Sequence, residues 1–124
     1  MARILIAEDE EALCAMCARA LEGAGHDVAT ALDGSAALDL LKREGGRFDL
    51  LLTDIRMPVM DGIALSLAVA RDYPELTILL MTGYADQRER AHGLDAIVHD
   101  VIAKPFTLAV LRAAVDEALT IKAR

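Results

Sequence analysis

Tryptophan is absent from this chain of 124 residues, and aromatic residues make up only 3% of it. Proteins that hold single-stranded nucleic acids stack the bases on aromatic side chains, so that mode of binding is not expected here. Basic residues are also in the minority, with 13 lysines and arginines against 20 acidic residues and a net charge of −7. Binding to nucleic acid or to an anionic membrane surface needs a basic footprint, so we expect neither partner.

Long hydrophobic runs are missing as well. No run approaches the roughly 20 residues that a membrane-spanning helix needs. The first hydrophobic run begins almost at the N-terminus, which leaves no room for a secretory signal peptide. The chain has only two cysteines, which favours a reducing compartment. We therefore expect a cytoplasmic protein with one domain over residues 1–124 and no output domain.

Hydrophobic residues account for 55% of the chain and recur in short runs rich in Ile, Leu and Val. Such runs, bounded by polar or turn residues, are typical of strands buried on both faces of a parallel sheet. We predict strands at Arg3–Ala7, Asp27–Ala31, Asp49–Thr53, Thr77–Met81 and Val101–Ala103. Helices are predicted at Glu10–Ala24, Gly34–Glu44, Ile63–Arg71, Ala85–Leu94 and Leu108–Lys122. This alternation predicts an α/β fold with a doubly wound parallel sheet and helices on both faces.

Two of these helices have unusual patterns. In Ala85–Leu94 only Ala85, Ala91 and Leu94 are apolar, which is a poor core-facing stripe, so we expect this helix to be short, mobile or displaced. The last helix has more apolar residues than a core stripe needs. That stripe consists of Leu108, Leu111, Val115 and Leu119. The excess is typical either of a helix packed closely on the sheet or of a partner or dimer face.

Polar side chains follow four of the hydrophobic runs. They are Glu8 and Asp9, then Asp54, Thr82 and Lys104. Because ligands of open parallel sheets bind at the carboxyl ends of the strands, we expect these side chains to converge in one crevice. Three carboxylates, a hydroxyl and an ammonium group suit a divalent metal ion and a phosphoryl group. The alternative without a binding function is a solvated network of salt bridges, which would contribute little to stability.

The chemistry that these groups could perform is phosphoryl transfer to a carboxylate. A carboxylate can act as the nucleophile and form an aspartyl phosphate. The incoming group is anionic, so its charge must be neutralised, and Mg²⁺ does this when it is held by one or two carboxylates. Asp9 and Asp54 could bind the ion directly, and Glu8 could bind it through water. The rest of such a reaction needs mainly positioning and electrostatic stabilisation.

Four segments at the predicted strand ends resemble the receiver domains of two-component response regulators. They are Ile4-Leu-Ile-Ala-Glu-Asp9, Leu52-Thr-Asp-Ile-Arg-Met-Pro-Val-Met-Asp-Gly62, Met81-Thr-Gly83 and Ala103-Lys-Pro-Phe106. The resemblance covers nearly the whole chain and implies a flavodoxin-like (CheY-like) five-stranded sheet in the order 2-1-3-4-5. It implies that Asp54 accepts phosphate from a histidine kinase or a histidine phosphotransfer protein. It further implies the site roles: Mg²⁺ is bound by Glu8, Asp9, Asp54 and the backbone carbonyl of Arg56, and the phosphoryl group is sensed by Thr82 and Lys104.

Some positions depart from the pattern of that family. Many receivers have Tyr or Phe where this chain has Val101, so we do not expect Thr82 to be coupled to a ring at that position. Our hypothesis is that Tyr84, two residues after Thr82, supplies a substitute ring. Many receivers also have Gly-Ala where this chain has Ile97-Val98, which again puts the fourth helix in question. We expect the bulky Arg56 and Tyr84 to hinder the attacking water and to set the lifetime of the phosphoryl group.

The resemblance implies a single-domain response regulator whose Mg²⁺-dependent phosphorylation on Asp54 switches protein–protein interactions. The partner face would be formed by the fourth helix, the fifth strand and the last helix, and the protein would be a monomer or a weak dimer. The Thr82-Gly-Tyr84 segment and Val101 are similar to CpdR-type regulators, which prime the ATP-dependent protease ClpXP. The alternatives are a phosphorelay intermediate and a phosphate-independent interaction module.

The alternative to these signalling roles is an enzymatic one. A small magnesium-dependent phosphatase or phosphotransferase would need a cap insertion to build a substrate pocket, and the chain has no segment long enough. Apart from loss of its own phosphoryl group, we therefore do not expect the protein to be a metabolic enzyme.

Cys14 and Cys17 form a C-x-x-C motif, which can mark a redox or metal site. The motif lies inside a predicted helix, and no second pair of ligands accompanies it. A stripe of Leu13, Cys17, Ala20 and Ala24 has the spacing of a core-facing helix surface. We therefore expect the cysteines to act as small buried hydrophobes.

Overall fold

The structure, a computed structural model, describes residues 2–83 and 92–123. Its sheet contains β1 (Arg3–Ala7), β2 (Asp27–Ala31), β3 (Leu50–Asp54), β4 (Thr77–Thr82) and β5 (Asp100–Ala103). The strands pair in parallel in the order β2-β1-β3-β4-β5. The helices of the described residues are α1 (Glu11–Gly23), α2 (Gly34–Arg43), α3 (Gly62–Asp72) and α5 (Leu108–Ala123), with a 3-10 turn η1 (His92–Leu94). The predicted fold class and strand order are confirmed.

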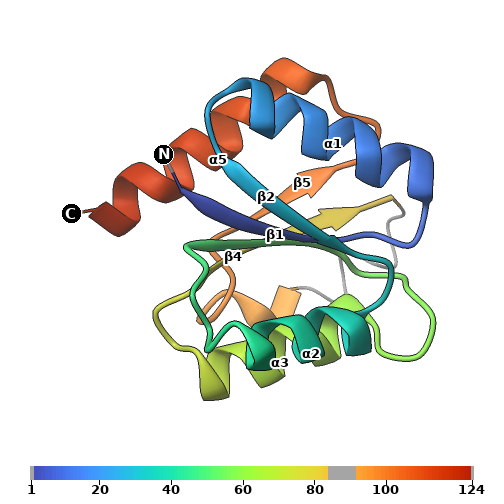
Figure 1. Cartoon of the computed structure of the whole chain (residues 1–124), viewed down its shortest axis with the longest axis vertical. Helices are drawn as coiled ribbons and strands as arrows, with labels where there is room; N and C mark the ends of the chain where they lie inside the picture. Colours follow the sequence, from blue (N-terminus) through green and yellow to red (C-terminus); the bar gives the residue numbers. More distant parts are fainter. Residues whose placement is uncertain (1, 84–91, 124) are drawn as a thin grey trace.

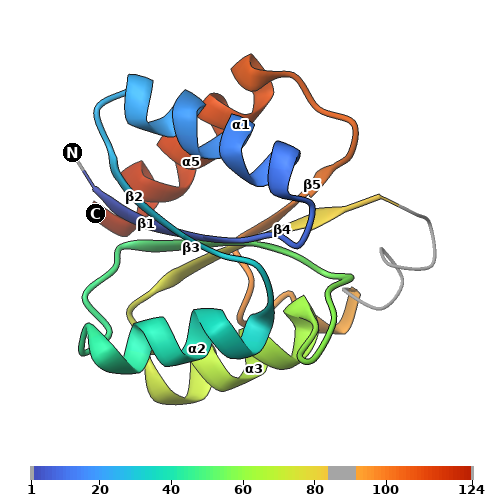
Figure 2. The same cartoon turned by 45° about the vertical axis from the view of Figure 1, so that its right-hand side comes forward.

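The helices cover the two faces of the sheet in pairs. Figures 1 and 2 show α1 and α5 on one face and α2 and α3 on the other. The strand sequences explain this arrangement, because successive side chains of a strand point to opposite faces. In β1, Ile4 and Ile6 pack with residues of α1 and α5, whereas Leu5 and Ala7 pack with residues of α2 and α3. Both faces are covered, so the central strands read as continuous hydrophobic runs.

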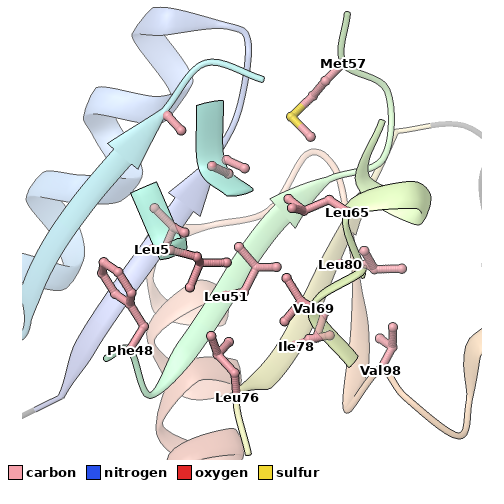
Figure 3. Packing of buried hydrophobic residues seen from close by; sticks show 14 of the residues in the cluster. Leu5, Phe48, Leu51, Met57, Leu65, Val69, Leu76, Ile78, Leu80 and Val98 are labelled. Carbon is pink, nitrogen blue, oxygen red and sulfur yellow. The ribbon is translucent and has the colours of Figure 1, made fainter. Parts of the chain in front are cut away.

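The core on the α2 and α3 side is almost entirely aliphatic. Figure 3 shows Leu51 and Leu80 of the sheet packed with Leu65 and Val69 of α3, and Phe48 is the one ring that it labels. Leu51, Leu65, Leu80 and Val69 are fully buried. In a chain without tryptophan, the buried side chains of this core are mainly Leu, Ile, Val and Ala.

Most predicted boundaries agree with the structure within one residue, and the small differences matter for the site. The strand predicted at Asp49–Thr53 is Leu50–Asp54, and the strand predicted at Thr77–Met81 continues to Thr82. The ladder explains both extensions, since Asp54 pairs with Met81 and Thr82 pairs with Ala103. Asp54 and Thr82 are therefore the last residues of rigid strands rather than the first residues of loops.

The helix predicted at Ala85–Leu94 lies mostly outside the described residues, as does Tyr84 with the hypothesis placed on it. The described end of that segment, His92–Leu94, is one 3-10 turn and not α-helix. The Ile97-Val98 pair follows it, and Val98 is 8% exposed in the core beside α3. Ile97 is partly buried against the same core cluster, so both residues of the pair contribute to core packing.

The core stripes predicted for α1 and α5 need correction. In α1 the buried residues are Cys14, Cys17, Ala20 and Leu21, so the predicted Leu13 and Ala24 are not at the centre of the stripe. In α5, Leu111, Val115 and Ala118 are fully buried, but Leu108 is 37% exposed. Helical Cβ atoms tilt toward the N-terminus, so the side chain of the first residue extends past the end of its own helix.

Among the helices in residues 2–83 and 92–123, none combines the length and the hydropathy that crossing a bilayer requires.

Candidate functional site

An open cleft of about 370 Å³ lies at the carboxyl edge of the sheet. The end of β3 and the loops after β1, β3, β4 and β5 supply its lining, which consists of Glu8, Asp9, Glu10, Asp54, Arg56, Gly83 and Lys104. Residues that are up to 96 positions apart in the sequence are in direct contact here. The carboxyl ends of parallel strands meet at this edge, so the convergence follows from the topology.

Three carboxylates form the acidic part of the cleft. Glu8, Asp9 and Asp54 each offer an oxygen, and these atoms all lie within 4.8 Å of one another. Glu8 is 1% exposed and Asp54 is 6% exposed, whereas Asp9 is exposed to solvent. Oxygen donors from carboxylates are the ligands that Mg²⁺ and Ca²⁺ prefer, so the chemistry of this donor set fits a hard divalent cation.

Lys104 places the positive charge of the cleft between two of these acids. Its Nζ lies 2.5 Å from Oε1 of Glu8 and 3.3 Å from Oδ2 of Asp54. The position of Lys104 is set by the sheet, because it follows β5 directly and its backbone N–H donates to the carbonyl of Thr82 at 2.6 Å. The ammonium group therefore offsets the repulsion between Glu8 and Asp54.

Burial and pairing act differently on the two partners of this ion pair. The pKa of Glu8 is raised to about 7, chiefly by burial, against the hydrogen bond from Lys104 and with a smaller contribution from the negative charge of Asp54. Burial alone would lower the pKa of Lys104, but the hydrogen bond to Glu8 and the charge of Asp54 raise it overall. Lys104 thus remains charged at neutral pH, while Glu8 is close to its titration midpoint.

Asp54 is held in one orientation by the backbone. The N–H of Ile55 donates to Oδ1 of Asp54 at 2.9 Å. The other carboxylate oxygen, Oδ2, is the one near Lys104. The two oxygens of Asp54 are therefore not equivalent: Oδ1 accepts from the backbone, and Oδ2 lies beside the Lys104 ammonium.

The loop from β3 to α3 is pinned close to Asp54. A Cβ added to Gly62 would lie 1.9 Å from the carbonyl oxygen of Asp54, so no larger residue fits. The N–H of Gly62 donates to the carbonyl of Ile55 at 2.8 Å, and Asp61 caps α3 by accepting from Ala64 at 2.8 Å. These contacts fix the path of the loop that carries Arg56.

The structure brings together five of the six residues that the sequence singled out. Thr82 is the exception, because it is 2% exposed at the end of β4 and is not among the residues that line the cleft. Two further lining residues were missed. Gly83 follows Thr82 directly, and Glu10 donates its backbone N–H to Oε2 of Glu8 at 3.2 Å. The acidic run Glu8–Glu11 was the only sequence signal for Glu10.

The C-x-x-C motif belongs to the core. Cys14 and Cys17 are free thiols with exposures of 3% and 0%. Burial raises the pKa of both thiols, that of Cys17 to about 11. Because the thiolate is the reactive form, this environment suits packing and not redox chemistry or metal binding.

Comparisons with a family model and with curated proteins find the same kind of protein. A family model described as the response regulator receiver domain matches residues 4–116. The chain is 35% identical over 106 residues to the transcriptional regulatory protein TcrA of Mycobacterium tuberculosis. The aligned region covers 86% of this chain and 41% of TcrA. The chain spans less than half the length of the curated relatives that it matches, for example 47% of response regulator MprA of Mycolicibacterium vanbaalenii, at 36% identity over 90% of this chain.

Solved structures agree with these relatives. A CheY-like receiver domain protein of Methanospirillum hungatei has a TM-score of 0.87 at 30% identity, covering 97% of this chain and 94% of the other. The response regulator TrrA of Thermotoga maritima, solved in complex with Mg(2+)-BeF, has a TM-score of 0.84 at 27% identity, covering 96% of this chain and 100% of the other.

Proposed function

The chain belongs to the response regulator receiver domain family, and from this premise we propose that it is a phosphorylation-controlled switch with Asp54 as the phosphoacceptor. The observation that carries the proposal is the geometry around Asp54, which has two acids and one lysine within reach of its carboxylate. Receiver domains are signalling modules of two-component systems. In this role the protein changes its own phosphorylation state and does not turn over a metabolite.

The reaction is a transfer of one phosphoryl group. Oδ2 of Asp54 attacks the phosphorus of a phosphohistidine on a histidine kinase or histidine phosphotransfer protein. An O–P bond forms as the P–N bond breaks, and the electron pair of the broken bond stays on the imidazole nitrogen. Such transfers need little covalent help from the acceptor beyond position and charge, and the cleft supplies both.

A divalent cation completes the charge balance of this reaction. Glu8, Asp9, Asp54 and the backbone carbonyl of Arg56 would hold Mg²⁺, which neutralises negative charge on the transferred group when it is bound. The donor set of three carboxylates supports this assignment. The Mg(2+)-BeF complex of TrrA gives further support from a relative of the same fold.

Lys104 and Thr82 form the route from the phosphoryl group to the surface. A phosphoryl group on Oδ2 would add a charge of about −2 next to the Lys104 ammonium. That ammonium lies 3.3 Å from Oδ2 in the structure. Lys104 then loses part of its pairing with Glu8. Its backbone joins β5 to Thr82 of β4, so a shift of Lys104 reaches both strands. Thr82 ends the strand next to β3, and its hydroxyl is the group that we assign to contact the phosphoryl group.

The output of this switch is a protein contact near β5 and α5. Three large apolar side chains of α5 are exposed: Leu108 by 37%, Val110 by 49% and Ile121 by 47%. Exposed apolar side chains grouped on one element favour protein binding. We place the partner on this face together with the segment before β5. The similarity to CpdR-type regulators makes an ATP-dependent protease the first partner to test, and a phosphotransfer protein is the alternative.

The test is intact-protein mass after incubation with acetyl phosphate, with and without Mg²⁺. Wild type should gain one phosphoryl group only with Mg²⁺, and Asp54→Ala should gain none. Asp39→Ala is the matched control, because Asp39 is an exposed acid of α2 that is not among the residues lining the cleft. If wild type gains no phosphoryl group, the proposal is wrong and the chain is a phosphate-independent interaction module.

Arg56 lines the cleft and so stands in the path of water that would hydrolyse the acyl phosphate. Loss of phosphate should therefore be faster in Arg56→Asn than in wild type. Equal rates for the two proteins would show that Arg56 does not set the lifetime.

A further inference from the structure

Thr53 is a fully buried residue whose hydroxyl lies in a hydrocarbon layer of the core. Its pairing partners in the sheet are Ala7 of β1 and Leu80 of β4, and both are fully buried members of the core beside α2 and α3. Valine has nearly the same shape and would bury no polar atom. Burial of a hydroxyl costs free energy unless it is hydrogen-bonded, so its bond must account for its presence.

The hydroxyl of Thr53 is bonded to the backbone of the candidate nucleophile. Its Oγ1 donates to the carbonyl oxygen of Asp54 at 2.9 Å. The same oxygen lies against Gly62, which has no room for a Cβ. The carbonyl of Asp54 is therefore restrained from two directions, by a hydrogen bond and by a close backbone contact.

The restrained carbonyl belongs to the peptide group that also orients the carboxylate. A peptide group is planar, so fixing its C=O also fixes the direction of its N–H. In this peptide the N–H is that of Ile55, which donates to Oδ1 of Asp54 at 2.9 Å. With Oδ1 held in this way, Oδ2 is left beside the Lys104 ammonium.

We propose that Thr53 is a positioning residue for phosphoryl transfer, which acts through the Asp54–Ile55 peptide to aim Oδ2 of Asp54 at the incoming phosphorus. The inference rests on the proposed function, since it concerns the rate at which Asp54 is phosphorylated. Thr53 itself does not touch the transferred group. Its hydroxyl reduces the number of orientations that the carboxylate samples, and a reactive group held in one orientation reacts faster.

A purely structural role for Thr53 makes the opposite predictions for two substitutions. Thr53→Val keeps the volume and removes the hydroxyl, whereas Thr53→Ser keeps the hydroxyl and leaves a small cavity. If packing were the only role, Val would be well tolerated and Ser would be the worse variant. If the hydroxyl positions Asp54, Val is the slow variant and Ser recovers the rate despite lower stability.

The experiment measures the rate constant of phosphorylation by acetyl phosphate at saturating Mg²⁺, together with the melting temperature of each protein. We expect Thr53→Val to lower the rate constant about tenfold, and Thr53→Ser to recover most of it while melting at a lower temperature than wild type. Ser66→Ala is the matched control, because Ser66 is also fully buried and donates to a backbone carbonyl, that of Gly62, at 2.7 Å. It should lose stability and keep the wild-type rate constant.

Three results would overturn the role of Thr53: a wild-type rate constant for Thr53→Val, an equal slowing in Thr53→Ser, or an equal slowing in Ser66→Ala. A wild-type protein that gains no phosphoryl group would instead contradict the proposed function. The two failures are therefore distinguishable in one series of measurements.

Discussion

At the scale of single residues, the main feature of the site is that ionisable side chains are buried close together. Glu8 is 1% exposed and lies near the carboxylates of Asp9 and Asp54. Its pKa of about 7 is raised from an ordinary value of 4.5 chiefly by burial. Between about pH 4.5 and 7, Glu8 is protonated in the folded protein and ionised in the unfolded chain, so the chain takes up a proton when it folds. Its free energy of unfolding therefore falls as the pH rises through this window.

The variant Glu8→Gln should remove this dependence in the absence of divalent metal. Because the glutamine stays neutral, the variant should gain stability relative to wild type as the pH rises from about 5 to 8, by up to ~3 kcal/mol. Urea denaturation at several pH values in EDTA measures the difference. Asp9→Asn is the control and should keep the wild-type pH dependence, since Glu8 is still present. A constant difference between wild type and Glu8→Gln at all pH values would show that Glu8 does not titrate in this window.

Val59 is a second residue that lowers the stability of the folded protein. Its φ is 69°, in the left-handed region, and its side chain is 85% exposed. A β-branched residue is strained in that region, whereas glycine and asparagine adopt it readily. Val59→Gly and Val59→Asn should therefore raise the free energy of unfolding by about 1 kcal/mol, and Val59→Ala should raise it less. Chemical denaturation checks the order, which would be contradicted if Ala stabilised the protein most.

The sequence could identify the charged residues of the site but not their contacts. The acids and Lys104 were predictable, because a parallel sheet brings the residues that follow its strands to one edge. The hydrogen bond of Thr53 and the burial of Thr82 were not predictable. Both depend on side-chain orientation at the last residues of β3 and β4, and a shift of one residue reverses the face to which a side chain points.

At the scale of elements, the loop from β3 to α3 has the least freedom. Gly62→Ala would place a methyl group 1.9 Å from the carbonyl oxygen of Asp54, so the loop or the strand end must move. We expect a loss of at least ~2 kcal/mol of stability and slower phosphorylation of Asp54. Gly23→Ala in α1 is the matched control, because its Cβ would meet its nearest neighbour at 3.6 Å. Melting curves of both variants test this, and equal melting temperatures would refute the close approach.

Helix α1 gives an independent test of the core. Cys14 and Cys17 are buried, and burial raises the pKa of both thiols. Neither should react with a thiol reagent at neutral pH in the folded protein, and both should react once urea unfolds it. Mass spectrometry counts the labelled thiols. Rapid labelling of folded protein would show that α1 does not pack on the sheet as described.

Helices and strands were predictable where hydrophobic periodicity is strong. The central strands are continuous hydrophobic runs and α1 has the periodic stripe of a helix, and the bounds of all of them differ from the prediction by no more than one residue. The segment predicted as Ala85–Leu94 lacks such a pattern, and its described end, His92–Leu94, is a 3-10 turn. In α5 the pattern gave the helix but misplaced Leu108, since periodicity does not report where a helix end extends past its neighbours.

At the scale of the whole molecule, one sheet links the cleft to a distant surface. Asp54 and Thr82 end adjacent strands, and Lys104 follows the next strand along. In the proposed switch, a new charge on Asp54 would act on these strands, which also form the edge near α5 (Figure 2). A single modification would in this way shift the population of two surface states.

The most direct test of this account is to locate the modified residue after treatment with acetyl phosphate. Hydroxylamine converts an acyl phosphate into a hydroxamate, which peptide mass spectrometry can assign to one side chain. The account predicts a hydroxamate at Asp54 alone, formed only when Mg²⁺ was present during phosphorylation. A hydroxamate at Glu8 or Asp9, or equal modification of Asp54 without Mg²⁺, would contradict it.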